Sequence, residues 1–191
     1  MRKAALLGFA LAAALARPAP ADDLRTVTTL YGLDALAGTL CLTSGAYGTA
    51  ITNQRVANVC SHLSFRTLPD QLVTGIQGLE KGAIVDLGDP LEIAARYGFR
   101  ESVGNGQGFV SIALKDGKLL IRKGERDLQP LHEHERLLTP KPNASVPVKI
   151  GHIYVVRIER PGETTLYAKL LVVAHALAQT VTIRWTVLTE G

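Results

Sequence analysis

The densest group of residues that could bind a metal or transfer protons is the run His132-Glu133-His134-Glu135. On a helix, side chains two residues apart point roughly 200° apart, so His132 and His134 would share a face only on a strand. The H-E-x-x-H spacing of helical zinc sites is absent from this run. We therefore predict an exposed, salt-bridged surface here rather than a metal site, and we predict no cofactor.

A second group of polar and aromatic residues lies near the C-terminus, where the sequence predicts strands. If two of these strands pair around a turn at Pro161 and Gly162, Lys169 lies opposite Tyr154 or Val155. Such pairs ordinarily stabilise a sheet by stacking across strands, and we favour this interpretation. The alternative is a sheet face that binds an anionic or carbohydrate ligand, with the candidate residues Tyr154, Arg157, Tyr167, Lys169 and Arg184.

Cys41 and Cys60 are the only two cysteines of the chain. In an oxidising compartment such a pair forms a disulfide, whereas in apolar strands the two thiols can stay free and buried. We predict the disulfide, because the N-terminal sequence indicates export. The spacing lacks the C-x-x-C pattern of redox and zinc sites.

Linear motifs for catalysis are absent from the sequence. The glycine-rich stretch at residues 104–108 leads into a predicted strand, whereas a phosphate-binding loop leads into a helix, so we interpret it as a turn. No G-x-S-x-G sequence occurs. The alternative to a binding role is a hydrolase or metal site assembled from distant residues, using His132, His134 or His152. A histidine within about 3 Å of a Ser, Asp or Glu in a cleft would favour it.

Hydrophobic periodicity predicts a three-stranded antiparallel meander at the C-terminus. Residues 181–187 alternate apolar and polar side chains, and residues 166–174 are apolar at nearly every position, which is typical of a central strand. Residues 150–159 form the first strand of the three, before the turn at Pro161 and Gly162.

Upstream, the sequence predicts a strand, a hairpin and two short helices. Residues 82–87 read as a strand, and Asp116-Gly117 between apolar runs predicts a hairpin over residues 109–123. A capping box that starts at Asp89 predicts a helix ending at Gly98. Residues 127–138 predict a second helix, and the proline-rich residues 139–148 predict an exposed connector.

The strings Gly151-His152-Ile153-Tyr154, Tyr167-Ala168-Lys169 and Arg184-Trp185 resemble a segment of uncharacterised exported bacterial proteins. The resemblance covers about forty residues. It implies a β-module in an exported bacterial protein, and it implies no catalytic residues.

The N-terminus has the order of properties that directs a chain to export. Arg2 and Lys3 precede thirteen uncharged, mostly apolar residues, and Ala19 and Ala21 precede a cleavage site before Asp22. We predict a signal peptide at residues 1–21. Its removal leaves 18 Lys and Arg residues against 17 Asp and Glu, a net charge of +1. This balance argues against a nucleic-acid partner, and no later segment is apolar enough to predict a transmembrane helix.

These patterns together predict a β-rich α+β fold with antiparallel sheets, the C-terminal meander and one or two short helices. We expect residues 22–138 and the meander at residues 149–191 to dock as one globule. For function, we predict a non-catalytic binding or structural module of the periplasm or envelope. Its partner would be a protein or an envelope ligand.

Overall fold

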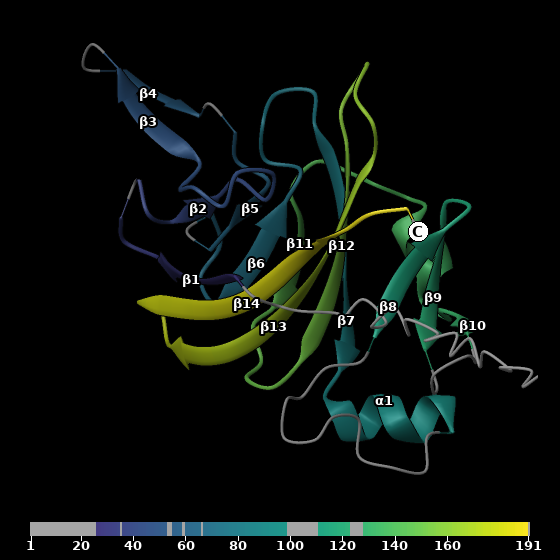
Figure 1. The fold of residues 1–191 in the computed structure, drawn as a ribbon. Coiled ribbons are helices and arrows are strands. Elements are labelled where there is room, and N and C mark those ends of the chain that lie inside the picture. The colour runs from purple at the N-terminus through teal and green to yellow at the C-terminus, as the bar shows by residue number, and fades with distance from the viewer. Residues whose placement is uncertain are drawn as a thin grey trace, which may run out of the picture.

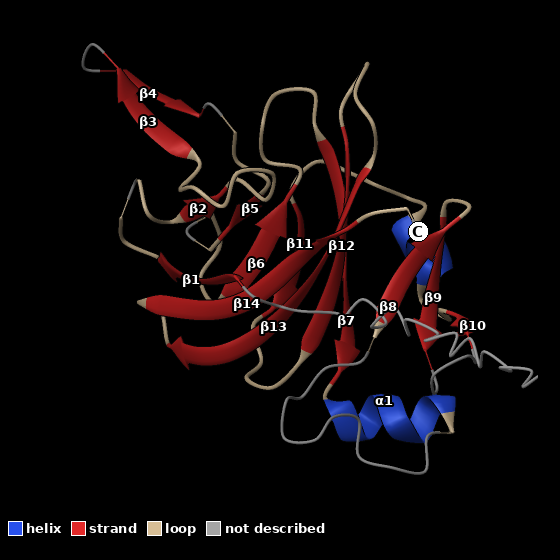
Figure 2. Ribbon diagram, viewed as in Figure 1, coloured by secondary structure: helices blue, strands red, loops and turns tan. Residues whose placement is uncertain are grey.

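The middle of the molecule is a five-stranded antiparallel sheet (Figures 1 and 2). This computed structural model describes residues 26–34, 36–52, 55–58, 60–65, 67–98, 111–122 and 128–190. The predicted signal peptide at residues 1–21 and the glycine-rich stretch at residues 104–108 lie outside them. In sheet order, the strands are β1 (Thr26–Tyr31), β14 (Thr180–Leu188), β13 (Leu166–Ala176), β12 (Ile153–Glu159) and β7 (Lys81–Gly88).

The predicted C-terminal meander is confirmed, because β12, β13 and β14 follow one another in the chain and in the sheet. Strand β13 lies at the centre of the sheet and packs apolar side chains on both faces, as its continuous apolar sequence indicates. The β-rich α+β fold class is confirmed as well. The described part of the chain contains four antiparallel sheets and two short helices.

Each face of the five-stranded sheet covers a separate hydrophobic core. Successive side chains of a strand point to opposite faces, so Val155 lies in one core while Tyr154 and Val156 lie in the other. We call the core that contains Val155 the first core and the core that contains Tyr154 the second core. The five-stranded sheet is therefore the middle layer of three.

A four-stranded sheet closes the second core. In order, its strands are β11 (Ala144–Pro147), β6 (Gln71–Thr74), β5 (Leu63–Ser64) and β2 (Thr39–Leu40). Strand β11 falls within the predicted connector at residues 139–148, and Ala144 is buried there. That part of the connector is therefore a strand, because residues 144–147 pair with β6.

A disulfide joins the chain directly after β2 to the chain just before β5. Cys41 and Cys60 are bonded, with their Cα atoms 5.1 Å apart. The predicted disulfide is confirmed, and the alternative of two free thiols is wrong. Between the two cysteines, β3 (Thr49–Thr52) pairs with β4 (Arg55–Asn58).

A three-stranded sheet and two helices close the first core. They are β10 (Leu128–Pro130), β9 (Lys118–Arg122), β8 (Ile112–Lys115), α1 (Pro90–Tyr97) and α2 (His134–Leu137). The predicted hairpin is confirmed: β8 and β9 are joined by Asp116 and Gly117, whose φ angles of 50° and 69° suit a tight hairpin turn. None of the helices in this description is long and apolar enough to cross a membrane.

One predicted helix is confirmed, and the other is shorter than predicted. Helix α1 has the capping box that the sequence indicates, with the Asp89 side chain accepting from the backbone of Glu92, and it ends at Gly98. The helix predicted over residues 127–138 is reduced to the single turn α2, since residues 128–130 pair as β10 with β9. Pro130, which lacks an N–H and disfavours a helix interior, lies in β10.

The two large sheets meet where Gly75, just after β6, lies against Gly82 in β7. A Cβ on Gly75 would lie 2.5 Å from the Gly82 nitrogen, so only glycine permits this approach. Beside it, the Gly82 N–H donates to the Lys141 carbonyl at 3.0 Å, and the Lys141 N–H donates to the Gly82 carbonyl at 2.8 Å. These contacts fix β7 and the chain leading into β11 to each other at one end.

Replacing Gly82 by alanine tests this junction. The new Cβ would lie 2.5 Å from Thr74 Cγ2 and 2.7 Å from the Gly75 nitrogen. Because the second neighbour is backbone, rotation of a side chain does not relieve the contact, and we expect the unfolding free energy to fall by about 3 kcal/mol. Urea denaturation measures this loss.

The matched control is Gly162→Ala, where a Cβ meets no atom within 4 Å and only the φ of 79° is unfavourable. We expect this variant to lose about 1 kcal/mol through backbone strain alone. Equal losses in the two variants would contradict the close approach of the sheets.

Candidate functional site

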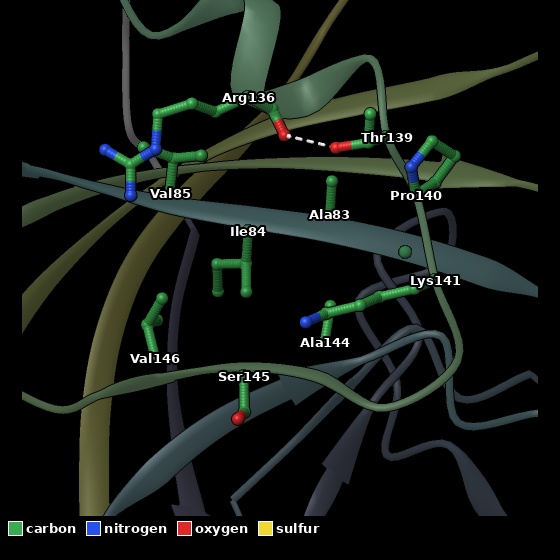
Figure 3. Close-up of a pocket in the computed structure, with 11 residues that line it drawn as sticks. Ala83, Ile84, Val85, Arg136, Thr139, Pro140, Lys141, Ala144, Ser145 and Val146 are labelled. Atoms are coloured by element: carbon green, nitrogen blue, oxygen red, sulfur yellow. Dashed lines mark hydrogen bonds between the residues drawn. The ribbon is translucent and has the colours of Figure 1, made fainter.

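A groove with a volume of about 680 Å³ lies between β7 and β11, the outer strands of the two large sheets (Figure 3). Residues 82–85 of β7 and residues 144–146 of β11 form two sides. Arg136, Thr139, Pro140 and Lys141 complete the lining. The volume is in the range of small-ligand sites. The groove is open to solvent rather than enclosed, so a longer ligand could extend beyond it.

The edge of β7 presents hydrogen-bonding groups of the backbone to this groove. In an antiparallel ladder, alternate residues direct both N–H and C=O to the same side. The backbone N–H and C=O of Gly82 point away from β12 and bond to Lys141. The N–H and C=O of Ile84, two residues further on, therefore point the same way. No hydrogen bond joins these groups of Ile84 to another described residue, although Ile84 is only 8% exposed.

Two cationic side chains flank the edge of β7 on opposite sides. Figure 3 shows Arg136 on the side of Val85 and Lys141 on the side of Ile84 and Val146. Within the described ranges, neither the Arg136 guanidinium nor the Lys141 ammonium has an ion-pair or hydrogen-bond partner, and no carboxylate lines the groove. The groove therefore carries uncompensated positive charge that attracts anionic groups.

The structure does not bring the predicted ligand residues of the meander together on an open surface. Arg157, Tyr167, Lys169 and Arg184 lie on the face of the first core, whereas Tyr154 lies on the opposite face. Tyr154 and Lys169 are fully buried, and Tyr167 is 6% exposed. None of the five residues lines the groove.

Tyr154 and Arg157 instead make internal contacts. The Tyr154 hydroxyl donates to the Pro147 carbonyl at 3.0 Å and accepts from the Lys149 N–H at 2.9 Å. Burial, together with the negative charge of Asp86, raises the pKa of Tyr154 and keeps this hydroxyl protonated. Arg157 lies opposite Tyr167, with its guanidinium carbon 5.9 Å from the ring centroid, which agrees with stacking across strands.

The prediction of an exposed surface at residues 132–135 is wrong for Glu133, which is 7% exposed. Glu133 pairs with Arg96 and accepts from the Tyr97 hydroxyl at 2.7 Å. The ring of His132 stacks on Tyr97 with centroids 4.5 Å apart. Burial and the hydrogen bond to Glu133 raise the pKa of Tyr97. This acidic residue therefore holds α1 against the turn that contains α2.

His152 lies 2.9 Å from an oxygen of Asp86, which satisfies the distance, though not the location in a cleft, that would favour the hydrolase alternative. The same carboxylate is 3.2 Å from the Lys149 ammonium. Burial opposes ionisation of Asp86, yet hydrogen bonds from His152, Gly88 and Lys149 hold its pKa below the usual range. However, no described hydroxyl or thiol hydrogen-bonds to His152, and the pair does not line the groove. The pair thus has no nucleophile beside it in the described part of the chain.

Among the described residues, three potential metal ligands meet at Cys41, Cys60 and His62, whose ligand atoms lie within 4.8 Å of one another. The two sulfur atoms are bonded to each other, so neither is a thiolate. The Leu42 N–H donates to Nδ1 of His62 at 3.1 Å, which places the ring proton on Nε2. No nitrogen of this ring is then free to bind a metal, and the group serves as a structural contact.

Sequence reasoning missed the groove because its cations belong to segments interpreted as solvent-exposed. Arg136 directly follows the His and Glu run, and Lys141 lies in the predicted connector. A usable signal was Val146 directly before Pro147, since valine favours strands and proline within a strand marks an outer strand. The sequence did not predict that β11 pairs with β6 or that β11 lies near β7, because no local pattern indicates which strands are neighbours.

Comparisons with protein-family models, with curated proteins and with solved structures found no match to this chain. The groove therefore has to be interpreted from its own geometry and charge.

His62 provides a pH-dependent test of the packing around the disulfide. Burial, with the positive charge of Arg160 nearby, lowers the pKa of His62 from 6.5 to about 4. Between these two values the unfolded chain binds a proton that the folded chain does not, so the unfolding free energy falls as the pH drops. At pH 4.5 we expect a loss of about 2 kcal/mol from this group relative to pH 7.

Urea denaturation of the wild type and of His62→Asn at both pH values measures this effect. Asparagine does not titrate, and its side-chain oxygen can accept the Leu42 N–H in place of Nδ1. Other titrating groups, such as Glu80 with its raised pKa, are common to both chains and cancel in the comparison. A pH dependence as steep in the variant as in the wild type would contradict the assignment.

Proposed function

We propose that this chain is an exported binding protein whose β7–β11 groove takes an elongated ligand that carries carboxylates. The observation that carries the proposal is the pair Arg136 and Lys141, which flank an open groove without a described anionic partner. On protein surfaces, cationic side chains are ordinarily interspersed with acidic ones. Two uncompensated cations on one groove therefore favour an anionic ligand.

The chemistry of the lining supports binding rather than catalysis. The groove residues offer the hydroxyls of Thr139 and Ser145 and the two cations, and no described histidine or carboxylate lines it to transfer a proton. The Thr139 hydroxyl is engaged in a hydrogen bond to the Arg136 carbonyl at 3.5 Å. This combination orients and neutralises an anion, which is the role of a binding site.

Export to the periplasm or cell exterior has two independent supports. The first is the order of charged, apolar and small residues over residues 1–21. The second is the Cys41–Cys60 disulfide, since such bonds persist mainly in oxidising compartments. A binding protein in this location meets peptides and polysaccharides of the envelope that carry carboxylates.

The double variant Arg136→Gln/Lys141→Gln tests the proposal. We expect the wild-type chain, residues 22–191, to bind a fluorescein-labelled oligoglutamate or oligogalacturonate at low salt. Loss of the two cations should raise the dissociation constant of the probe by about tenfold or more, equivalent to about 1.4 kcal/mol of binding free energy. Fluorescence anisotropy titrations measure the dissociation constants.

The matched control is Lys115→Gln/Lys118→Gln, which removes the same charge from the exposed β8–β9 turn, away from the groove. Its affinity should stay within about twofold of the wild type, because distant exposed charges are screened. The proposal fails if the wild type binds neither probe, or if both double variants lose affinity equally.

A further inference from the structure

The outer edge of β7 begins a strand ladder that stops after one step. Gly82 and Lys141 exchange two hydrogen bonds of 3.0 and 2.8 Å, the pattern of directly paired residues in an antiparallel ladder. In an antiparallel ladder the residue that would face Ile84 is Thr139, two residues before Lys141, but there the chain bends out of α2 and makes no backbone hydrogen bond to Ile84. On the other side of the bridge, the chain leads from Lys141 into β11, which pairs with β6 instead. Ile84 is the next outward-facing position, and no described strand pairs with it there.

We propose that an extended peptide segment of a partner protein continues this ladder by adding as a strand to the outer edge of β7. The inference rests on the proposed function and names the chemistry of the ligand. Ile84 is only 8% exposed, and backbone groups at such positions are normally hydrogen-bonded. An extended peptide supplies an acceptor and a donor together, at strand spacing. The hydroxyls of an oligogalacturonate also donate and accept, but they are not N–H and C=O groups paired along one edge at strand spacing.

The two cations specify which side chains the added strand carries. Successive side chains of a strand point to opposite faces. Arg136 and Lys141 lie on opposite sides of β7 (Figure 3). Two consecutive acidic residues in the bound segment therefore reach one cation each. The apolar side chains of Val85 and Val146 line the same two sides, so apolar residues suit the flanking positions of the segment.

A second copy of this chain fits the same edge less well. Pairing β7 with its counterpart across a two-fold axis places Arg136 and Lys141 of both copies along one junction. No described carboxylate of the groove is available to neutralise them. Like charges opposed in this way destabilise a strand pair, and outward cations are a common device against edge-to-edge association.

The test uses the chain of residues 22–191 and the acetylated, amidated peptide Thr-Val-Glu-Glu-Val-Thr. Three other probes accompany it: a Gln-Gln version and two versions that are N-methylated at alternate residues, one along each edge of the strand. An oligogalacturonate is the non-peptide arm. Isothermal titration calorimetry gives affinities, and amide hydrogen exchange by NMR follows Ile84, with Lys115 in the distant turn as the control amide.

We expect the acidic peptide to bind and the Gln-Gln version to bind at least about tenfold more weakly. Methylation along the edge that pairs with β7 removes donors and should also weaken binding about tenfold, whereas methylation along the other edge should not. The Ile84 amide should gain protection from exchange in the complex, and the Lys115 amide should not.

Three results would overturn the inference. Equal binding of the peptide, both methylated versions and the oligogalacturonate would leave the proposal of a cationic, anion-binding groove in place but exclude strand addition. A stable dimer of the free chain in sedimentation analysis, with Ile84 already protected, would assign the edge to a second copy. Binding of none of the probes would overturn the inference and the proposed function together.

Discussion

The contact between Gly75 and Gly82 is the constraint on which the arrangement of the two large sheets depends. Neither residue can carry a Cβ, since each would place it 2.7 Å or less from backbone of the other. The approach lets Gly82 bond to Lys141, and this bridge holds β7 and β11 at one end. Further along, the two strands have no backbone pairing with each other, and the groove fills the space between them.

Burial of the five-stranded sheet on both faces explains why its polar residues do not form a binding surface. A strand in the middle layer has no solvent-facing side, so Lys169 is enclosed even though a lysine normally marks an exposed position. Tyr154, one of the largest side chains of the sheet, is fully buried in the second core. At its outer strand β7, this sheet presents backbone groups of Ile84 that no described residue hydrogen-bonds.

Several titratable residues pair with other side chains inside the protein, whereas Arg136 and Lys141 do not. Glu133 joins Arg96 and Tyr97, and Asp86 joins His152. Each of these carboxylates has a structural partner that accounts for its position. The cations of the groove have none among the described residues, which is why their charge is available to a ligand.

The sequence by itself determined the local elements and the kind of fold. Period-two patterns fixed β14, a capping box fixed α1, and Asp116-Gly117 fixed the β8–β9 turn, because each depends on residues close together in the chain. Tertiary structure alone decided that residues 128–130 pair as a strand, that Glu133 is buried, and that β11 lies beside β7. These outcomes depend on which distant segments meet. The pairing of Gly82 with Lys141 shows why no local pattern encodes them, because the two residues lie far apart in the sequence and each finds its hydrogen-bond partner only in the folded chain.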